Sequence, residues 1–148
     1  MIDQRSFPQV PESVPRARRF VAEMIAGISD AVTERTAVMV SELATNAIRH
    51  AATPFAVRVE VTPTEVCLEV TDSGPGEPGL RAPAPRAPSG RGLRIVDALS
   101  DDWGVRPDPS GRGKTVWFSV SLPAGVVLAH RQRTMKLKSS GKDSMVAP

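Results

Sequence analysis

The chain has 148 residues, 41% of them hydrophobic and 24% charged, a composition typical of a globular protein with a single hydrophobic core. We identify no membrane-spanning apolar run and no secretory signal, and the single cysteine excludes an internal disulfide framework, so we expect a cytoplasmic protein. Residues 126–148 carry a net charge of +4, so the net charge of +3 leaves −1 for the other 125 residues. Because that body is nearly neutral and only 4% of the chain is aromatic, direct nucleic-acid binding is not expected.

Two helices are predicted in the first third of the chain. Residues 1–12 contain two prolines and are expected to form an extended arm, after which a helix begins near Pro15. Asp30 is a suitable N-cap for a second helix that runs to about Ala52. The expected buried stripes are Val14, Ala17, Val21, Met24, Ile25 and Ile28 in the first helix, and Val40, Leu43, Ala44, Ala47 and Ala51 in the second.

Alternating apolar residues predict two pairs of strands. Residues 57–61 and 66–70 are joined by a turn short enough for an antiparallel hairpin, and Cys67 inside the second strand is interpreted as structural or incidental. Residues 103–106 and 114–122 form the second pair, preceded by a helix over about 92–100.

Two segments are expected to lie outside the regular elements. Residues 75–88 contain five prolines, which favours a mobile lid. The basic residues 124–148 are expected to form a partly disordered tail. The element order predicts an α+β protein in which helices cover one face of a mixed, mostly antiparallel sheet, a two-layer α/β sandwich.

Three groups of polar residues interrupt this pattern. Glu42, Asn46 and His50 recur every four residues on one side of the second helix, and we expect all three side chains to be partly buried beside the sheet. A carboxylate and an amide one turn apart can share a cation and its phosphates, although such pairs are also common on solvated helices. Asp72–Gly76 follows a strand and offers an acceptor beside accessible backbone, or an ordinary turn. Ser89–Gly92 opens a helix, which is either a phosphate site or a simple loop–helix junction.

Taken in order, these groups resemble the boxes of the GHKL (Bergerat-fold) ATPase and kinase superfamily. Residues 41–51 resemble its N-box, residues 72–76 its adenine box and residues 90–96 its second glycine box, while residues 113–118 resemble its last strand. The resemblance covers about residues 10–123. Residues 13–123 are therefore expected to form an ATP-binding domain of the HATPase_c type, most similar to the anti-sigma factor serine-protein kinases (RsbW/SpoIIAB-like).

The resemblance implies a role for each matching residue. Asn46 would coordinate Mg²⁺ and Glu42 would act as the general base, while Asp72 would accept a hydrogen bond from adenine. The other nucleotide-binding positions would be the backbone at the glycines, a charge clamp, and a threonine near the base: Gly74, Gly76, Gly90, Gly92, Arg91 and Thr115. His50 has no secure role.

The implied function is Mg-ATP-dependent phosphorylation of a serine or threonine on an anti-anti-sigma (STAS) partner, which regulates a sigma factor. The chain could form a homodimer. The alternative is a nucleotide-binding regulatory module without kinase activity, and a third hypothesis is nucleic-acid binding through the tail.

Overall fold

A computed structural model describes residues 1–51, 53–74 and 88–123. Their elements, in chain order, are β1 (Ile2–Phe7), α1 (Ser13–Met24), α2 (Asp30–Asn46), the π-helix η1 (Ala47–Ala51), β2 (Phe55–Val61), β3 (Glu65–Asp72), α3 (Pro88–Leu99), β4 (Asp102–Pro107) and β5 (Lys114–Ser121). The predicted lid at 75–88, apart from Pro88, and the predicted tail at 124–148 lie outside the described residues.

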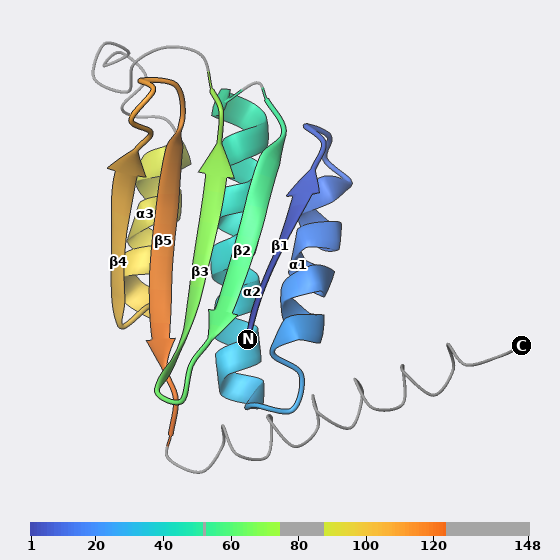
Figure 1. Ribbon diagram of the computed structural model, residues 1–148, viewed down its shortest axis with the longest axis vertical. Helices are drawn as coiled ribbons and strands as arrows, with labels where there is room; N and C mark the ends of the chain where they lie inside the picture. The colour runs from blue at the N-terminus through green and yellow to red at the C-terminus, as the bar shows by residue number, and fades with distance from the viewer. Residues whose placement is uncertain (52, 75–87, 124–148) are drawn as a thin grey trace, which may run out of the picture.

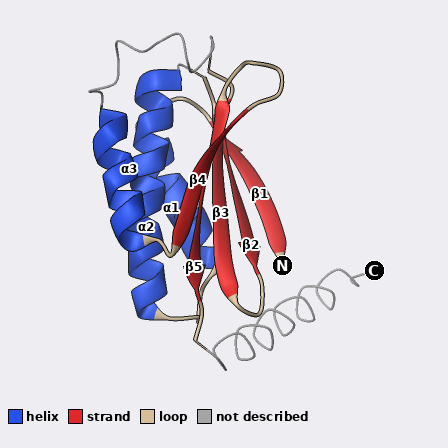
Figure 2. Ribbon diagram, turned by 90° about the vertical axis from the view of Figure 1, so that its left-hand side faces the viewer, coloured by secondary structure: helices blue, strands red, loops and turns tan. Residues whose placement is uncertain are grey.

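The described strands form one five-stranded sheet in the order β1-β2-β3-β5-β4, and all three α-helices cover the same face (Figures 1 and 2). The α+β sandwich expected from the sequence is confirmed. The expected mixture of strand directions is not, because every neighbouring pair is antiparallel. β3 and β4 run in the same direction, but β5 returns between them and separates them.

The N-terminal segment expected as an arm is part of this sheet. β1 pairs with β2 from Ile2 opposite Glu60 to Phe7 opposite Phe55, so it forms one edge of the sheet. Its residues do not alternate clearly in polarity, which is why the pairing was not predicted. The chain reverses its direction between β1 and α1, again between α1 and α2, and a third time between α2 and β2, so the two strands meet antiparallel (Figure 1).

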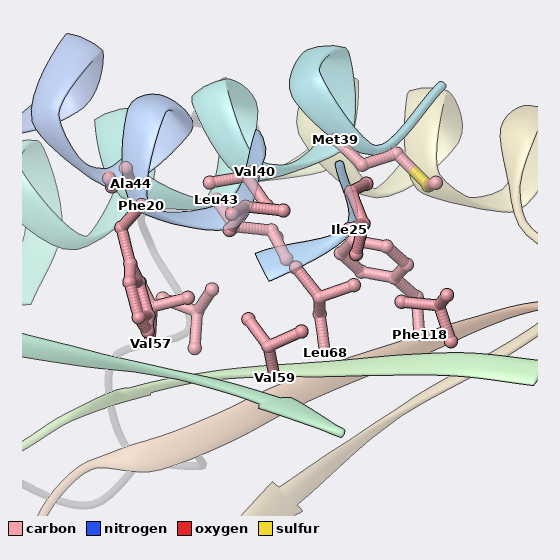
Figure 3. Close-up of a cluster of buried hydrophobic side chains, with 14 of the residues drawn as sticks. Phe20, Ile25, Met39, Val40, Leu43, Ala44, Val57, Val59, Leu68 and Phe118 are labelled. Atoms are coloured by element: carbon pink, nitrogen blue, oxygen red, sulfur yellow. The ribbon is translucent and has the colours of Figure 1, made fainter. Parts of the chain in front are cut away.

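The core fills the space between the helices and the inner face of the sheet (Figure 3). The predicted alternation in β2, β3 and β5 is confirmed, because the residues expected to share one face are the buried ones. In α1 the largest buried side chain is Phe20, which is 1% exposed and was not in the expected stripe. The five residues expected to line the second helix are all buried.

The start of α2 differs from the prediction by one residue. Ser29, not Asp30, is the N-cap: its backbone is extended and its hydroxyl oxygen accepts a hydrogen bond from the Val32 N–H at 3.4 Å. Asp30 is instead the first helical residue, where its negative charge interacts favourably with the positive end of the helix dipole.

The outer face of the sheet is charged. A guanidinium nitrogen of Arg58 lies 3.5 Å from a carboxylate oxygen of Glu60 and of Glu69. A guanidinium nitrogen of Arg106 lies 2.6 Å from the other carboxylate oxygen of Glu69. The half-buried Cys67 lies among these groups. Burial is the main cause that raises the pKa of its thiol, and the negative charge of nearby glutamates, above all Glu69, raises it further. The thiol is therefore protonated near neutral pH, which supports the interpretation that Cys67 is not a nucleophile. In the described part of the chain, no helix combines the length and the apolar character that crossing a membrane requires.

Candidate functional site

β3, β5 and the π-helix η1 meet at one end of the sheet, the upper end in Figure 1. β3 ends there and β5 begins there, with Asp72 opposite Lys114 in the ladder. The π-helix η1 reaches the end of β3, since a Cβ added to Gly74 would lie 3.2 Å from the Cα of Ala51. The Thr53 hydroxyl accepts a hydrogen bond from the Ser73 N–H at 3.2 Å, which also ties the segment after η1 to this end. This convergence brings together residues that are far apart in sequence.

The Asp72 carboxylate lies on the inner, helix-facing side of the sheet, in line with buried Val70, and is only 7% exposed. Its Oδ1 accepts a hydrogen bond from the Gly74 N–H at 3.0 Å, and its Oδ2 accepts one from the Lys114 ammonium at 3.1 Å. A carboxylate offers about four acceptor positions, so roughly two remain for a ligand donor. Asp72 can therefore recognise an amino group at the end of the sheet.

Gly113 brings the backbone of β5 against the end of β3. Its φ is 81°, and a Cβ added there would lie 2.1 Å from the carbonyl oxygen of Asp72 and 2.8 Å from the Cα of Ser73. The preceding turn is held by hydrogen bonds from Gly111 N–H to the Asp108 carbonyl at 2.9 Å and from Asp108 N–H to the Gly113 carbonyl at 3.1 Å. Only glycine fits this close approach, and it fixes the position of Asp72.

Gly113→Ala is therefore expected to lower the free energy of unfolding by roughly 2–5 kcal/mol, from left-handed strain and a backbone clash together. Gly111 is a matched control, because its φ is 79° but an added Cβ would meet nothing within 4 Å. Gly111→Ala should lower it by only about 1–2 kcal/mol, the strain alone. Chemical denaturation measures both values, and equal losses would contradict the close approach at Gly113.

Asn46, the last residue of α2, lies against the first turns of α3. A Cβ added to Gly92 would lie 2.6 Å from the Asn46 Nδ2, so the backbone of α3 reaches the amide only because residue 92 is glycine. The Asn46 side chain is half-buried and makes no hydrogen bond with another described residue. An amide that bonds none of the described residues and lies beside glycine backbone fits a site that binds a hard cation and its phosphates.

Glu42 lies one turn before Asn46 on α2, and its half-buried carboxylate forms no ion pair with another described residue. The opposite end of α3 is held to α2 by Arg35, whose Nε donates to the Leu99 carbonyl at 2.8 Å. Because this contact fixes α3 beside α2, it supports the approach of Gly92 to Asn46.

His50 departs from the helical position that the spacing predicts. The helix changes from α to π geometry at Ala47, and a π-helix bonds residue i to i+5, so each residue turns through a smaller angle about the axis. His50 is consequently exposed, while Ala47 and Ala51 remain buried. Our expectation that His50 would be partly buried with Glu42 and Asn46 is wrong.

The structure does not bring the Thr115 side chain to Asp72. Its hydroxyl lies 2.7 Å from that of Thr71, its partner in the ladder, and both side chains point to the outer face of the sheet. The inward residue at this level is Lys114, because Val116, Phe118 and Val120 are inward in the same strand. The alternation of β5 could have placed Lys114 on the inner face from the sequence alone.

The remaining glycine-box residues are only partly described. α3 begins at Pro88, so Gly90 and Arg91 lie in its first turns together with Gly92; this start is earlier than the expected residue 92. Gly76 lies outside the described residues.

Comparison with known proteins identifies the fold. No curated protein sequence matches significantly. A solved structure containing the RsbU and RsbW domains of a Mycobacterium tuberculosis protein superposes with a TM-score of 0.64 at 18% identity, covering 84% of this chain and 34% of that one. The histidine kinase domain of a blue-light activated histidine kinase from Erythrobacter litoralis superposes with a TM-score of 0.51 at 18% identity, covering 84% and 65%. The chain thus spans less than two thirds of either protein.

A family profile described as a histidine kinase-like ATPase domain matches residues 7–120, which is most of the chain and includes α2, β3, α3 and β5. The matched segment contains Glu42, Asn46, Asp72 and the glycines of both boxes. The chain therefore belongs to the histidine kinase-like ATPase domain family of the GHKL superfamily.

Proposed function

We propose that this domain binds Mg-ATP and transfers its terminal phosphoryl group to a serine or threonine of a STAS-domain anti-anti-sigma protein, and thereby regulates a sigma factor in the cytoplasm. The observation that carries the proposal is the contact between Asn46 and Gly92 at the sheet end that also holds Asp72. That contact brings the N-box and the second glycine box side by side, as one nucleotide site requires.

The base of the nucleotide would bind at the end of β3. Asp72 is inward, nearly buried and oriented by the Gly74 N–H at 3.0 Å, so it can accept a hydrogen bond from the adenine amino group. A Cβ on Gly74 would lie 3.1 Å from the Asp72 Oδ1, so glycine keeps the surroundings of this carboxylate open. Gly76, which lies outside the described residues, is a second proposed backbone contact with the nucleotide.

The phosphates would bind where α2 and α3 meet. The backbone N–H group near Gly90 lies in the first turn of α3, where the helix dipole favours anions, and Arg91 would add a positive charge, while Gly92 lets the backbone of α3 approach Asn46. Asn46 would hold Mg²⁺ through its side-chain oxygen. When bound, the metal neutralises the phosphate charge that develops during transfer.

Glu42 would act as the general base, one turn from Asn46. It would accept the proton of the partner's hydroxyl while that oxygen forms a bond to the terminal phosphorus. The bond from this phosphorus to the bridging oxygen breaks, so the products are ADP and a phosphoserine or phosphothreonine. The structural similarity to a protein with RsbU and RsbW domains supports a partner of the anti-anti-sigma class. The domain would act as a homodimer.

The test is incubation of the full chain with labelled ATP, Mg²⁺ and STAS-domain proteins, followed by detection of labelled phosphoserine or phosphothreonine. Label on the partner supports the kinase. ATP binding without transfer to any partner would instead indicate a nucleotide-binding regulatory module. Absence of ATP binding, measured by calorimetry, would contradict the proposal as a whole.

A further inference from the structure

A lysine stands beside the carboxylate that would recognise the base. Lys114 is the ladder partner of Asp72, and its ammonium lies 3.1 Å from the Asp72 Oδ2. The alternation of both strands directs the two side chains to the inner face of the sheet, toward α2 and α3. The Lys114 side chain is 37% exposed, whereas that of Asp72 is 7% exposed, so a partly accessible lysine lies next to a nearly buried carboxylate.

The pair combines one group that only accepts hydrogen bonds with one that only donates them. An ionised carboxylate is an acceptor, and an ammonium has three donors, of which a single one is needed for Asp72. Adenine presents the complementary arrangement on adjacent atoms: its exocyclic amino group donates, and the neighbouring ring nitrogen N1 accepts. A carboxylate and an ammonium at hydrogen-bond distance from each other can therefore bind both atoms of this edge.

We infer that Lys114 is a specificity-determining residue that donates a hydrogen bond to N1 of adenine while Asp72 accepts one from the amino group. The inference rests on the proposed function, because it assumes that the base binds at Asp72. The position is specific to Lys114: Arg112 precedes the close approach at Gly113, and Thr115 faces the outer side of the sheet.

The test compares the affinities of the full chain for ATP, for 1-deaza-ATP, which has a carbon in place of N1, and for GTP. The wild-type chain should bind 1-deaza-ATP roughly tenfold or more weakly than ATP, because a charge-assisted hydrogen bond is lost. Lys114→Met retains the apolar stem without the donor, so this variant should bind ATP and 1-deaza-ATP within about twofold of each other. Lys114→Gln restores an N–H donor and should recover part of the discrimination.

Arg106→Met is the matched control. Arg106 is also a strand cation paired with a carboxylate of β3, Glu69 at 2.6 Å, but that pair lies on the outer face. This variant should discriminate between ATP and 1-deaza-ATP as the wild type does. Circular dichroism of each variant establishes that it is folded before its affinities are compared.

Three results would overturn the role of Lys114: equal binding of ATP and 1-deaza-ATP by the wild type, unchanged discrimination in folded Lys114→Met, or tighter binding of GTP than of ATP. The last result would mean that the pair recognises the carbonyl and ring N–H of guanine instead. A wild-type chain that binds none of the three nucleotides would contradict the proposed function itself.

Discussion

Asn46→Ala is expected to weaken Mg-ATP binding by roughly 100-fold or more, because the variant would lack the side-chain oxygen that is proposed to hold the metal. The half-buried Asn46 has no hydrogen-bond partner among the described residues, so its removal leaves none of their polar groups unsatisfied. The fold should therefore remain intact while the affinity is lost. Calorimetric titration with ATP in the presence of Mg²⁺ measures the effect.

Two further variants test whether the loss of affinity is specific to the Asn46 amide. Gly92→Ala should reproduce the loss of affinity, because its Cβ would meet the Asn46 Nδ2 at 2.6 Å and displace the amide, the flexible end of a side chain. Thr45→Ala is the matched control on the same helix, since the Thr45 hydroxyl only donates to the Ser41 carbonyl at 2.7 Å, and it should bind Mg-ATP normally. Undiminished binding by Asn46→Ala would refute the assigned metal ligand.

Glu42→Ala is expected to lower the rate of phosphoryl transfer by about 10²–10⁴-fold, the usual contribution of a general base, while leaving the affinity for Mg-ATP nearly unchanged. Glu42 lies one helical turn from Asn46 and forms no ion pair with another described residue, so its loss should not displace the nucleotide site. The measurement is the rate of partner phosphorylation at saturating ATP, beside a calorimetric titration of the same variant.

The comparison of Glu42→Ala with Asn46→Ala separates catalysis from binding. If both variants lost ATP affinity equally, the division of roles between base and metal ligand would be wrong. If Glu42→Ala transferred phosphate at the wild-type rate, Glu42 would have no catalytic role, and the base would have to be sought elsewhere in the site.

Local periodicity predicted most of the elements, because each helix or strand buries a single face. The spacing of apolar residues along the sequence directly predicts the buried stripe from Val40 to Ala51 and the alternation of β2, β3 and β5. The errors occur where the deciding contact is not local. β1 was expected as an arm because its pairing with β2 crosses two helices, and Phe20 was omitted although it is among the largest side chains of the core.

In the candidate site, too, local features could be predicted from the sequence and long-range contacts could not. Glu42, Asn46 and Asp72 could be selected from their residue types and spacing, since each lies in a short motif whose chemistry is local. The contact between Asn46 and Gly92, and the pairing of Asp72 with Lys114, join segments that are 46 and 42 residues apart. The motif named Thr115, whose side chain lies on the outer face beside Thr71, because a sequence motif alone does not specify which face of the sheet a side chain occupies.

The apolar period was thus sufficient to predict the two-layer class and the described elements other than β1, because these depend on neighbours within a turn or a strand. Strand order, ladder register and the change from α to π geometry at Ala47 depended on the folded whole. The physical reason is that long-range packing selects one arrangement from many that satisfy the same local preferences: the insertion of β5 beside β3 is what brings Lys114 to Asp72.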